Sequence, residues 1–306
     1  MTVMRRLTIF SALTFGAASL FAQEDIPQYN PNSLNPIPRY EQLYKVKVWR
    51  HVRLDEKQNK GFFAKSNELT KLILEAINSG ELADLYLNDS LTTKKSKEDV
   101  LKDMILQEGE PADAWQPTNE YYEKDPVDFN GVPYRATKDI KGPDIGKAPD
   151  QSPDLWKQDN SVGKPVYAQA LHLAQIRIVE DMIFDKRRSR LYYDIQSITI
   201  IFPADKGNPR GGDLDIVTLK YKDLVQVFRN HPDDAIWFNR QNTAENRSYE
   251  EAFLLRLFHG TIEKVENPDN ETIQGVYSAR PYNEQVWARD WEEMRLMEKE
   301  HNLWEY

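Results

Sequence analysis

Proline is concentrated in one stretch of the chain, and that stretch limits where regular secondary structure can form. Eight of the 17 prolines lie between residues 108 and 165. Proline lacks a backbone N–H and is excluded from helix interiors and central strands, so we expect an irregular connection over 108–165. The stretch also carries six aromatic residues, too many for a solvated linker, and we expect it to pack on a domain surface or a partner. They are Trp115, Tyr121, Tyr122, Phe129, Tyr134 and Trp156.

The residues before this connection have the pattern of an N-terminal α+β domain over 42–107. Apolar and polar residues alternate over 44–53, which predicts a strand. Residues 66–79 carry an apolar stripe at helical spacing and predict a helix. Ser66 is its expected N-cap and Gly80 its expected left-handed end.

The residues after the connection have the pattern of a second, C-terminal α+β domain over 166–306. Two apolar runs on either side of the polar turn 185–190 predict a long antiparallel hairpin. Near the C-terminus, Trp287, Trp291 and Met294 recur at helical spacing and predict a charged amphipathic helix. The predicted fold class is therefore α+β, with two α+β domains joined by the proline-rich connection.

The first 22 residues have the layout of a secretory signal peptide. Arg5 and Arg6 precede an uncharged apolar run from Leu7 to Leu20. The run is shorter than the roughly 20 apolar residues that span a bilayer, so we expect a cleaved leader and not an anchor. Residues 23–41 contain prolines without helical or strand periodicity, and we expect an extended, proline-rich arm there.

Cysteine content and net charge limit which cellular compartment and which classes of partner are possible for this protein. The chain has no cysteine, which excludes disulfides, thiolate metal sites, a cysteine nucleophile and a lipid attached to an N-terminal cysteine. Its formal net charge of -9 argues against nucleic acid or anionic lipid as the main partner. We expect an exported, soluble protein that is held at a membrane only through a partner.

Sequence motifs for catalysis or metal binding are absent. The five histidines are scattered, and none has a second histidine at metal-ligand spacing. Glu180 and Asp181 are adjacent, so on a strand they point to opposite faces, and we expect one to be solvated and the other paired. We predict no catalytic, cofactor-binding or metal-binding residue. A periplasmic ligand-binding protein or hydrolase with groups distant in sequence stays open as the alternative, as does a chaperone-like accessory.

Short segments along the chain are similar to those of one protein family, both in their amino-acid sequence and in their order along the chain. In the first half they are Val48–Arg50, Glu56–Lys60 with Phe62–Phe63, and Asn88–Thr93. In the second half they are Val179–Lys186, Phe238–Asn242, Phe253–Phe258 and Leu303–Tyr306. With the export signal ahead of them, these segments resemble the GldN/PorN family of the type IX secretion and gliding machinery of Bacteroidota.

The resemblance implies a structural role in the periplasm and no enzymatic activity. The chain would form a ring-like scaffold, as a homo-oligomer, with a GldK/PorK-like outer-membrane lipoprotein. It would couple that ring to the GldL/GldM motor by contacting the periplasmic part of a GldM/PorM-like protein. As candidate partner contacts we name the aromatic residues of the connection and of the C-terminal tail, which are Trp115, Tyr121, Tyr122, Trp156, Trp304 and Tyr306.

Overall fold

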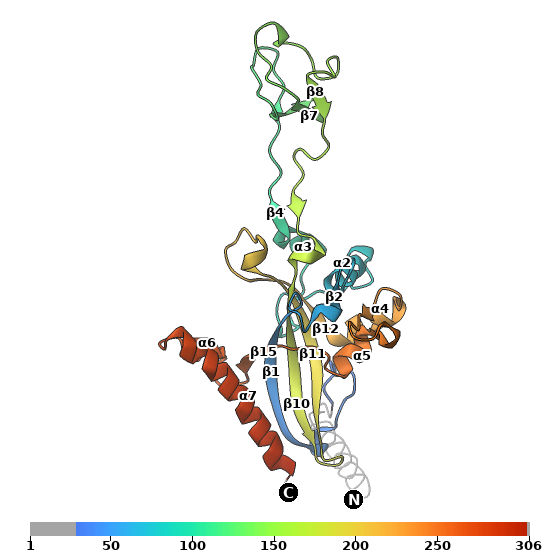
Figure 1. Ribbon diagram of the computed structural model, residues 1–306, viewed down its shortest axis with the longest axis vertical. Helices are drawn as coiled ribbons and strands as arrows, with labels where there is room; N and C mark the ends of the chain where they lie inside the picture. The colour runs from blue at the N-terminus through green and yellow to red at the C-terminus, as the bar shows by residue number, and fades with distance from the viewer. Residues whose placement is uncertain (1–28, 305–306) are drawn as a thin grey trace, which may run out of the picture.

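A five-stranded antiparallel sheet forms the centre of the molecule (Figure 1). The computed structural model describes residues 29–304, so the expected signal peptide lies outside the described residues. The strand order is β12-β11-β10-β1-β15. The bounds are β1 (Gln42–Arg53), β10 (Gln175–Asp185), β11 (Arg190–Phe202), β12 (Leu214–Lys220) and β15 (Thr261–Val265). The helices and this sheet confirm the α+β class.

The predicted hairpin is confirmed as strands β10 and β11. They pair antiparallel from Gln175–Ile201 to Asp185–Arg190. The turn between them is closed by Asp185, whose buried carboxylate accepts the N–H groups of Arg187 and Arg188 at 2.8 and 3.1 Å. An aspartate that accepts backbone N–H groups in this way replaces the hydrogen bonds that the turn itself cannot make.

Strand β1 joins the two segments that the sequence predicts as separate domains. It pairs with β10 from Tyr44 to Arg53 on one edge and with β15 on the other. Segments 42–107 and 166–306 therefore share one sheet, which differs from the expected division into two α+β domains. Strand alternation reveals that β1 is a strand but does not identify its partner, because pairing over so long a separation leaves no local signal.

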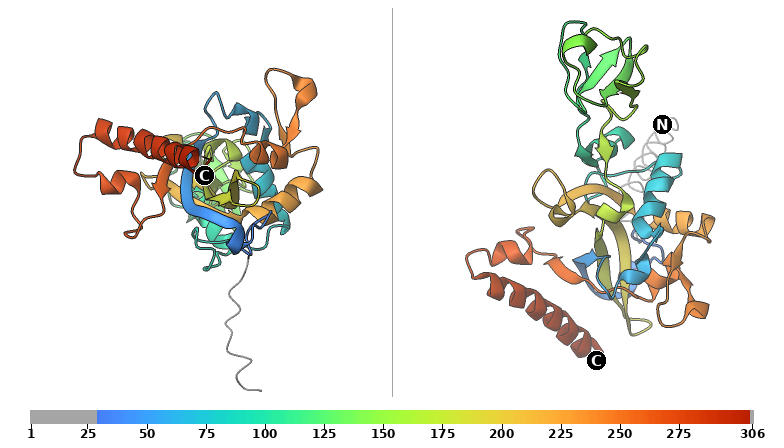
Figure 2. Two further views of the ribbon diagram at one scale, coloured as in Figure 1. Left: turned by 90° about the horizontal axis from the view of Figure 1, so that it is seen from below. Right: turned by 45° about the horizontal axis from the view of Figure 1, so that its top comes forward.

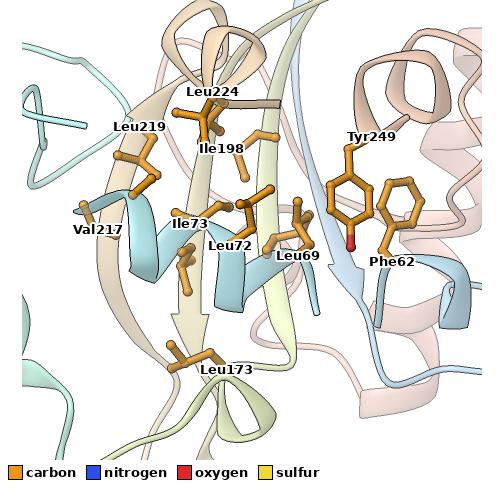
Figure 3. Close-up of a cluster of buried hydrophobic side chains, with 14 of the residues drawn as sticks. Phe62, Leu69, Leu72, Ile73, Leu173, Ile198, Val217, Leu219, Leu224 and Tyr249 are labelled. Atoms are coloured by element: carbon orange, nitrogen blue, oxygen red, sulfur yellow. The ribbon is translucent and has the colours of Figure 1, made fainter. Parts of the chain in front are cut away.

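The larger apolar core lies between this sheet and four helices. These are α2 (Leu69–Ser79), α3 (Lys97–Asp103), α4 (Tyr221–Asn230) and α5 (Tyr249–Leu254). Figure 3 shows side chains of α2 beside Ile198 and Leu219 of the sheet, with Phe62 beside Tyr249. The Phe62 ring also packs on Phe253, at a centroid distance of 4.9 Å. The expected apolar stripe of α2 is the face that is buried here.

The ends of α2 match the sequence prediction at one terminus only. Gly80 follows the helix with a φ of 83° and ends it in the left-handed conformation, as expected. The helix begins at Leu69, with Glu68 at the N-cap, so the expectation that Ser66 caps it is wrong. Ser66 instead has a φ of 69° in the turn between β2 (Phe63–Ala64) and β3 (Asn67–Glu68). That turn occupies the residues where a longer helix would begin.

A second apolar cluster lies toward the β15 edge of the sheet. The helices α6 (Ile273–Val276) and α7 (Tyr282–Trp304) contribute Ile273, Ala288 and Leu296 to it. They pack with Met182 of β10 and Ile262 of β15. The predicted C-terminal helix is thus confirmed, but Ala288 and Leu296 mark its buried side, not the aromatic residues that predicted it.

The expected irregular connection is instead a small lobe with a sheet and a core of its own. Its sheet has the order β5-β6-β7-β8, with bounds Asp113–Ala114, Pro126–Phe129, Val132–Ala136 and Trp156–Gln158. Asn130 and Gly131, with φ of 55° and 80°, form the tight turn between β6 and β7. The core consists of Tyr121, Val127, Ala136, Ile140, Leu155 and Trp156. Proline excludes long elements from this stretch, and the lobe accordingly uses short ones.

A narrow neck carries the lobe away from the main body (Figures 1 and 2). The neck is the antiparallel pair of β4 (Ile105–Gln107) and β9 (Val166–Tyr167). Beyond the neck, the two segments of the chain that enter and leave the lobe come very close together. A Cβ on Gly109 would lie 2.5 Å from the carbonyl carbon of Gly163. Only glycine fits at such an approach.

Two further features complete the main body. Strands β13 (Ile236–Trp237) and β14 (Arg247–Ser248) form a separate small pair before α5. The described part of the expected arm, residues 29–41, lies against the sheet. Its Asn30 side chain donates to Asp181 at 3.1 Å and to Gln196 at 2.6 Å.

The separate core of the lobe predicts that the main body folds without it. Residues 108–165 can be replaced by an Asn-Gly turn, because Gln107 and Val166 are already paired across the neck. We expect the free energy of unfolding of the main body to change by less than about 1 kcal/mol, since no residue of the larger apolar cluster is removed. Urea unfolding followed by far-UV circular dichroism measures this. Loss of cooperative unfolding would show that the lobe stabilises the sheet.

Candidate interaction surfaces

Helix α7 is fastened to the sheet through a buried group of charged side chains. The Glu180 carboxylate on β10 is 0% exposed. It accepts from Arg50 Nε at 3.2 Å and from Arg256 Nη1 at 2.6 Å. Arg50 extends the group to α7, where its Nη1 lies 3.4 Å from Glu293 Oε1. Arg50 also donates to the Gly260 carbonyl at 2.8 Å, and these partners satisfy charges that would otherwise be costly to bury.

Asp181 lies on the other face of β10 and is also buried and paired. Its Oδ2 lies 2.8 Å from the Lys45 ammonium. The expectation that one of the two adjacent carboxylates is solvated is therefore wrong, although the two do point to opposite faces. The sequence does not reveal that helices cover one face of β10 and that the arm covers the other, so neither carboxylate is left in solvent.

Asp194 faces Asp181 across the hairpin, so two carboxylates lie on neighbouring strands at this point of the sheet. Burial raises the pKa of Asp194, and the nearby Asp181 carboxylate adds to the rise. Gln196 donates to Asp194 at 2.7 Å, and Asn30 bridges Gln196 and Asp181. These contacts tie the arm to the sheet. Within residues 29–304, no group of three or more His, Asp or Glu side chains is placed to hold a metal ion.

Helix α7 exposes large apolar side chains on the side away from its buried face. Trp287, Trp291 and Met294, spaced four and three residues apart, are 65%, 51% and 56% exposed. Residues at this spacing lie on one face of a helix, so they form a continuous stripe. Large exposed apolar stripes on soluble proteins mark sites of interaction. The sequence identified these residues as part of an amphipathic helix but did not show which side of the helix they occupy.

The candidate contacts in the lobe divide into buried and exposed residues. Tyr121 and Trp156 are buried and pack edge to face at 5.2 Å, so they form the core of the lobe. Trp115 is half-buried and packs against Phe129 at 5.3 Å. Tyr122 is exposed, with the Lys141 ammonium 4.4 Å from its ring centre. In the lobe, Tyr122 is thus the candidate most accessible to a partner.

The candidate contacts of the C-terminal tail lie at the end of α7. Trp304 is exposed on one side and packs edge to face with Phe184 of β10 on the other, at 6.0 Å. Tyr306 lies outside the described residues. Trp304 therefore belongs to the same helix as the exposed stripe, and it also holds the last turn of that helix near the sheet.

Comparison with known proteins gives one match over most of the chain. A family described as "Gliding motility associated protein GldN" matches residues 37–305. No curated protein matches the chain. Over residues 29–304, no helix has the length and apolar character required to cross a bilayer. The matched range includes the sheet, the lobe and α7.

The buried position of Glu180 predicts a large loss of stability when its carboxylate is removed. The substitution Glu180→Ala leaves Arg50 and Arg256 without their shared partner, and we expect a loss of about 3–5 kcal/mol in the free energy of unfolding. Urea denaturation measures it. The matched control is Glu293→Ala, which removes a half-exposed partner at 3.4 Å and should cost less than about 1 kcal/mol. Equal effects would contradict the assigned roles.

The lobe is predicted to lose stability in acid through Asp159. Hydrogen bonds from the Ser161 hydroxyl and N–H, and then from Arg135, lower the pKa of Asp159 from 3.8 to about 2. Because the pKa is lower in the folded state, this stabilisation is complete above pH 3.8 and is lost as the pH falls through about 2. Hydrogen exchange of lobe amides across this range measures it. In Asp159→Asn the acid-dependent part should be absent, and an unchanged pH profile would refute the assignment.

Proposed function

Because the chain belongs to the GldN family of gliding motility associated proteins, we propose that it is a periplasmic scaffold of the type IX secretion and gliding machinery. Members of this family are components of that machinery. In our proposal, the chain is exported and forms a ring with a GldK/PorK-like outer-membrane lipoprotein. It links this ring to the periplasmic part of a GldM/PorM-like motor protein and has no enzymatic activity.

The exposed aromatic stripe of α7 is the observation that carries this proposal. A helix with two tryptophans and a methionine more than half exposed has a surface suited to a protein partner. The helix is anchored to the sheet by Arg50 and by its own apolar face, so it presents the stripe in a fixed position. A prepositioned surface loses little conformational entropy on binding, which favours a structural contact.

The lobe supplies a second surface at a distance from the first. It stands on the neck at one end of the molecule, whereas α7 lies beside the sheet (Figure 1). Two separated surfaces on one folded body allow the chain to contact a neighbouring subunit of the ring and a second protein at once, which a coupling element requires. Tyr122, with Lys141 beside its ring, is our proposed contact residue in the lobe.

The alternative, a periplasmic ligand-binding protein or hydrolase, has one observation in its favour. Asp194 has a raised pKa and lines a cavity of about 280 Å³ beside Arg229 and Glu250. A carboxylic acid with a raised pKa can serve as a general acid. Saturable binding of a small molecule to a monomer, abolished by Asp194→Ala, would favour this function over the scaffold.

Co-sedimentation with the lipoprotein is the test of the proposed scaffold. The chain is co-expressed with the GldK/PorK-like lipoprotein and analysed by sedimentation and negative-stain microscopy. We expect large co-sedimenting rings. The chain with residues 108–165 replaced by an Asn-Gly turn is the matched variant. We expect it to fold, and loss of its rings would assign the lipoprotein contact to the lobe. A monodisperse monomer that ignores the lipoprotein would refute the proposal.

A further inference from the structure

A basic, apolar groove lies on the main body away from both surfaces described above. It lies between the turn after β1 and the residues after β13 and has a volume of about 780 Å³. That volume falls within the roughly 300–1,000 Å³ of sites that bind ligands. Phe63, Trp237 and Phe238 supply its apolar surface.

The chain brings two segments unusually close to form this groove. A Cβ on Gly61 would lie 2.3 Å from Trp237 Nε1, so only glycine allows the indole to reach its position. The Phe238 N–H donates to the Gly61 carbonyl at 2.9 Å and fixes the two segments together. The apolar floor is therefore held in place by the backbone.

The charge of the groove is opposite to that of the chain. Its lining includes four cations, Lys57, Lys60, Lys65 and Arg240, and no carboxylate, whereas the whole chain has a formal net charge of -9. Lys60 lies over the Phe63 ring at 5.2 Å. As far as residues 29–304 show, none of the four forms an ion pair. The groove thus fits an occupant with large apolar side chains flanked by carboxylates.

The stripe of α7 has this chemistry. Asp290 lies between Trp287 and Trp291 in the sequence, and Glu298 follows Met294 by one helical turn. Both carboxylates are exposed, and in the described part of the chain neither forms an ion pair. A stripe of two indoles and a thioether with unpaired carboxylates beside it complements an apolar floor with unpaired cations around it.

We propose that the α7 stripe of one copy of this chain docks into the basic groove of a second copy. Figure 1 shows α7 beside the β15 edge of the central sheet and β2, which borders the groove, toward the β12 edge. The helix therefore does not reach the groove of its own chain. Contact between two different surfaces is head-to-tail, and repeated head-to-tail contacts produce rings or filaments. The inference rests on the proposed scaffold function and specifies how its copies contact one another.

Cross-linking between single cysteines tests the contact directly. The chain has no cysteine, so introduced thiols are the only ones that react. We would mix the Lys65→Cys and Met294→Cys chains and add a short bis-maleimide, with and without the lipoprotein. We expect a dimer in the mixture under at least one condition, and a ladder of multimers from the chain carrying both substitutions. The Glu75→Cys chain, with its thiol on the exposed side of α2, replaces Lys65→Cys as the matched control and should give no dimer with Met294→Cys.

Charge reversal separates a specific contact from chance collisions. With the thiols kept at residues 65 and 294, the pair Lys57→Glu and Lys60→Glu should lower the cross-linking yield about tenfold, and so should Asp290→Lys with Glu298→Lys. Mixing a chain that carries the reversed groove with one that carries the reversed helix should restore the yield. Failure of this rescue, or a yield no higher than with Glu75→Cys, would overturn the inference.

The test also distinguishes a wrong contact from a wrong function. Rings that form with the lipoprotein but give no copy-to-copy cross-link would leave the scaffold intact and overturn the inference. Protection of the Lys65→Cys thiol by the lipoprotein, again without a cross-link, would assign the groove to the lipoprotein and also overturn it. Loss of both rings and cross-links would refute the proposed function itself.

Discussion

The contact of Arg50 and Arg256 with the buried Glu180 carboxylate is the interaction on which the main body depends. It lies where strands from both halves of the chain meet, and it separates the larger apolar core from the cluster beneath α7. A buried carboxylate is tolerated only when its partners are correctly placed. The group therefore favours one arrangement of β1, β10 and α7 over others that would bury as much apolar surface. Its link to α7 is the contact of Arg50 with Glu293 at 3.4 Å, which adds to the apolar packing of Ala288 and Leu296.

Local elements of the fold were predictable from the sequence, whereas their assembly was not. The β10–β11 hairpin follows from two apolar runs around a polar turn, and the end of α2 follows from Gly80. The central position of β1 has no local signal, because any strand with an apolar face can pair with many others. The hairpin of the lobe did have a signal, since Asn130-Gly131 between Phe129 and Val132 is typical of a tight turn. The surrounding prolines hid it.

For the candidate interaction residues, too, the sequence predicted local features but not how the residues are arranged in the folded protein. Aromatic content predicted an irregular connection that packs on a domain surface or a partner. Composition does not distinguish Tyr121, which is buried in the lobe, from Tyr122, which is exposed beside it. In α7 the spacing of Trp287 and Trp291 identified the helix correctly. It did not reveal which side faces the protein, because Ala288 and Leu296 provide a flatter apolar face that packs closely on the sheet. The basic groove has no sequence motif at all, since its two segments are far apart in the chain.

The neck determines how a mechanical force on the lobe would travel through the molecule. Strand β9 leads through a short 3-10 turn directly into β10, and Figure 1 shows the neck in line with that strand. The part of a pull that β9 carries therefore acts along β10, which is hydrogen-bonded to β1 on one edge and to β11 on the other over its whole length. These bonds run perpendicular to the strand, so tension along it shears many of them at the same moment instead of peeling them apart one by one. The lobe is thus attached to the strand of the sheet best able to transmit tension without rupture.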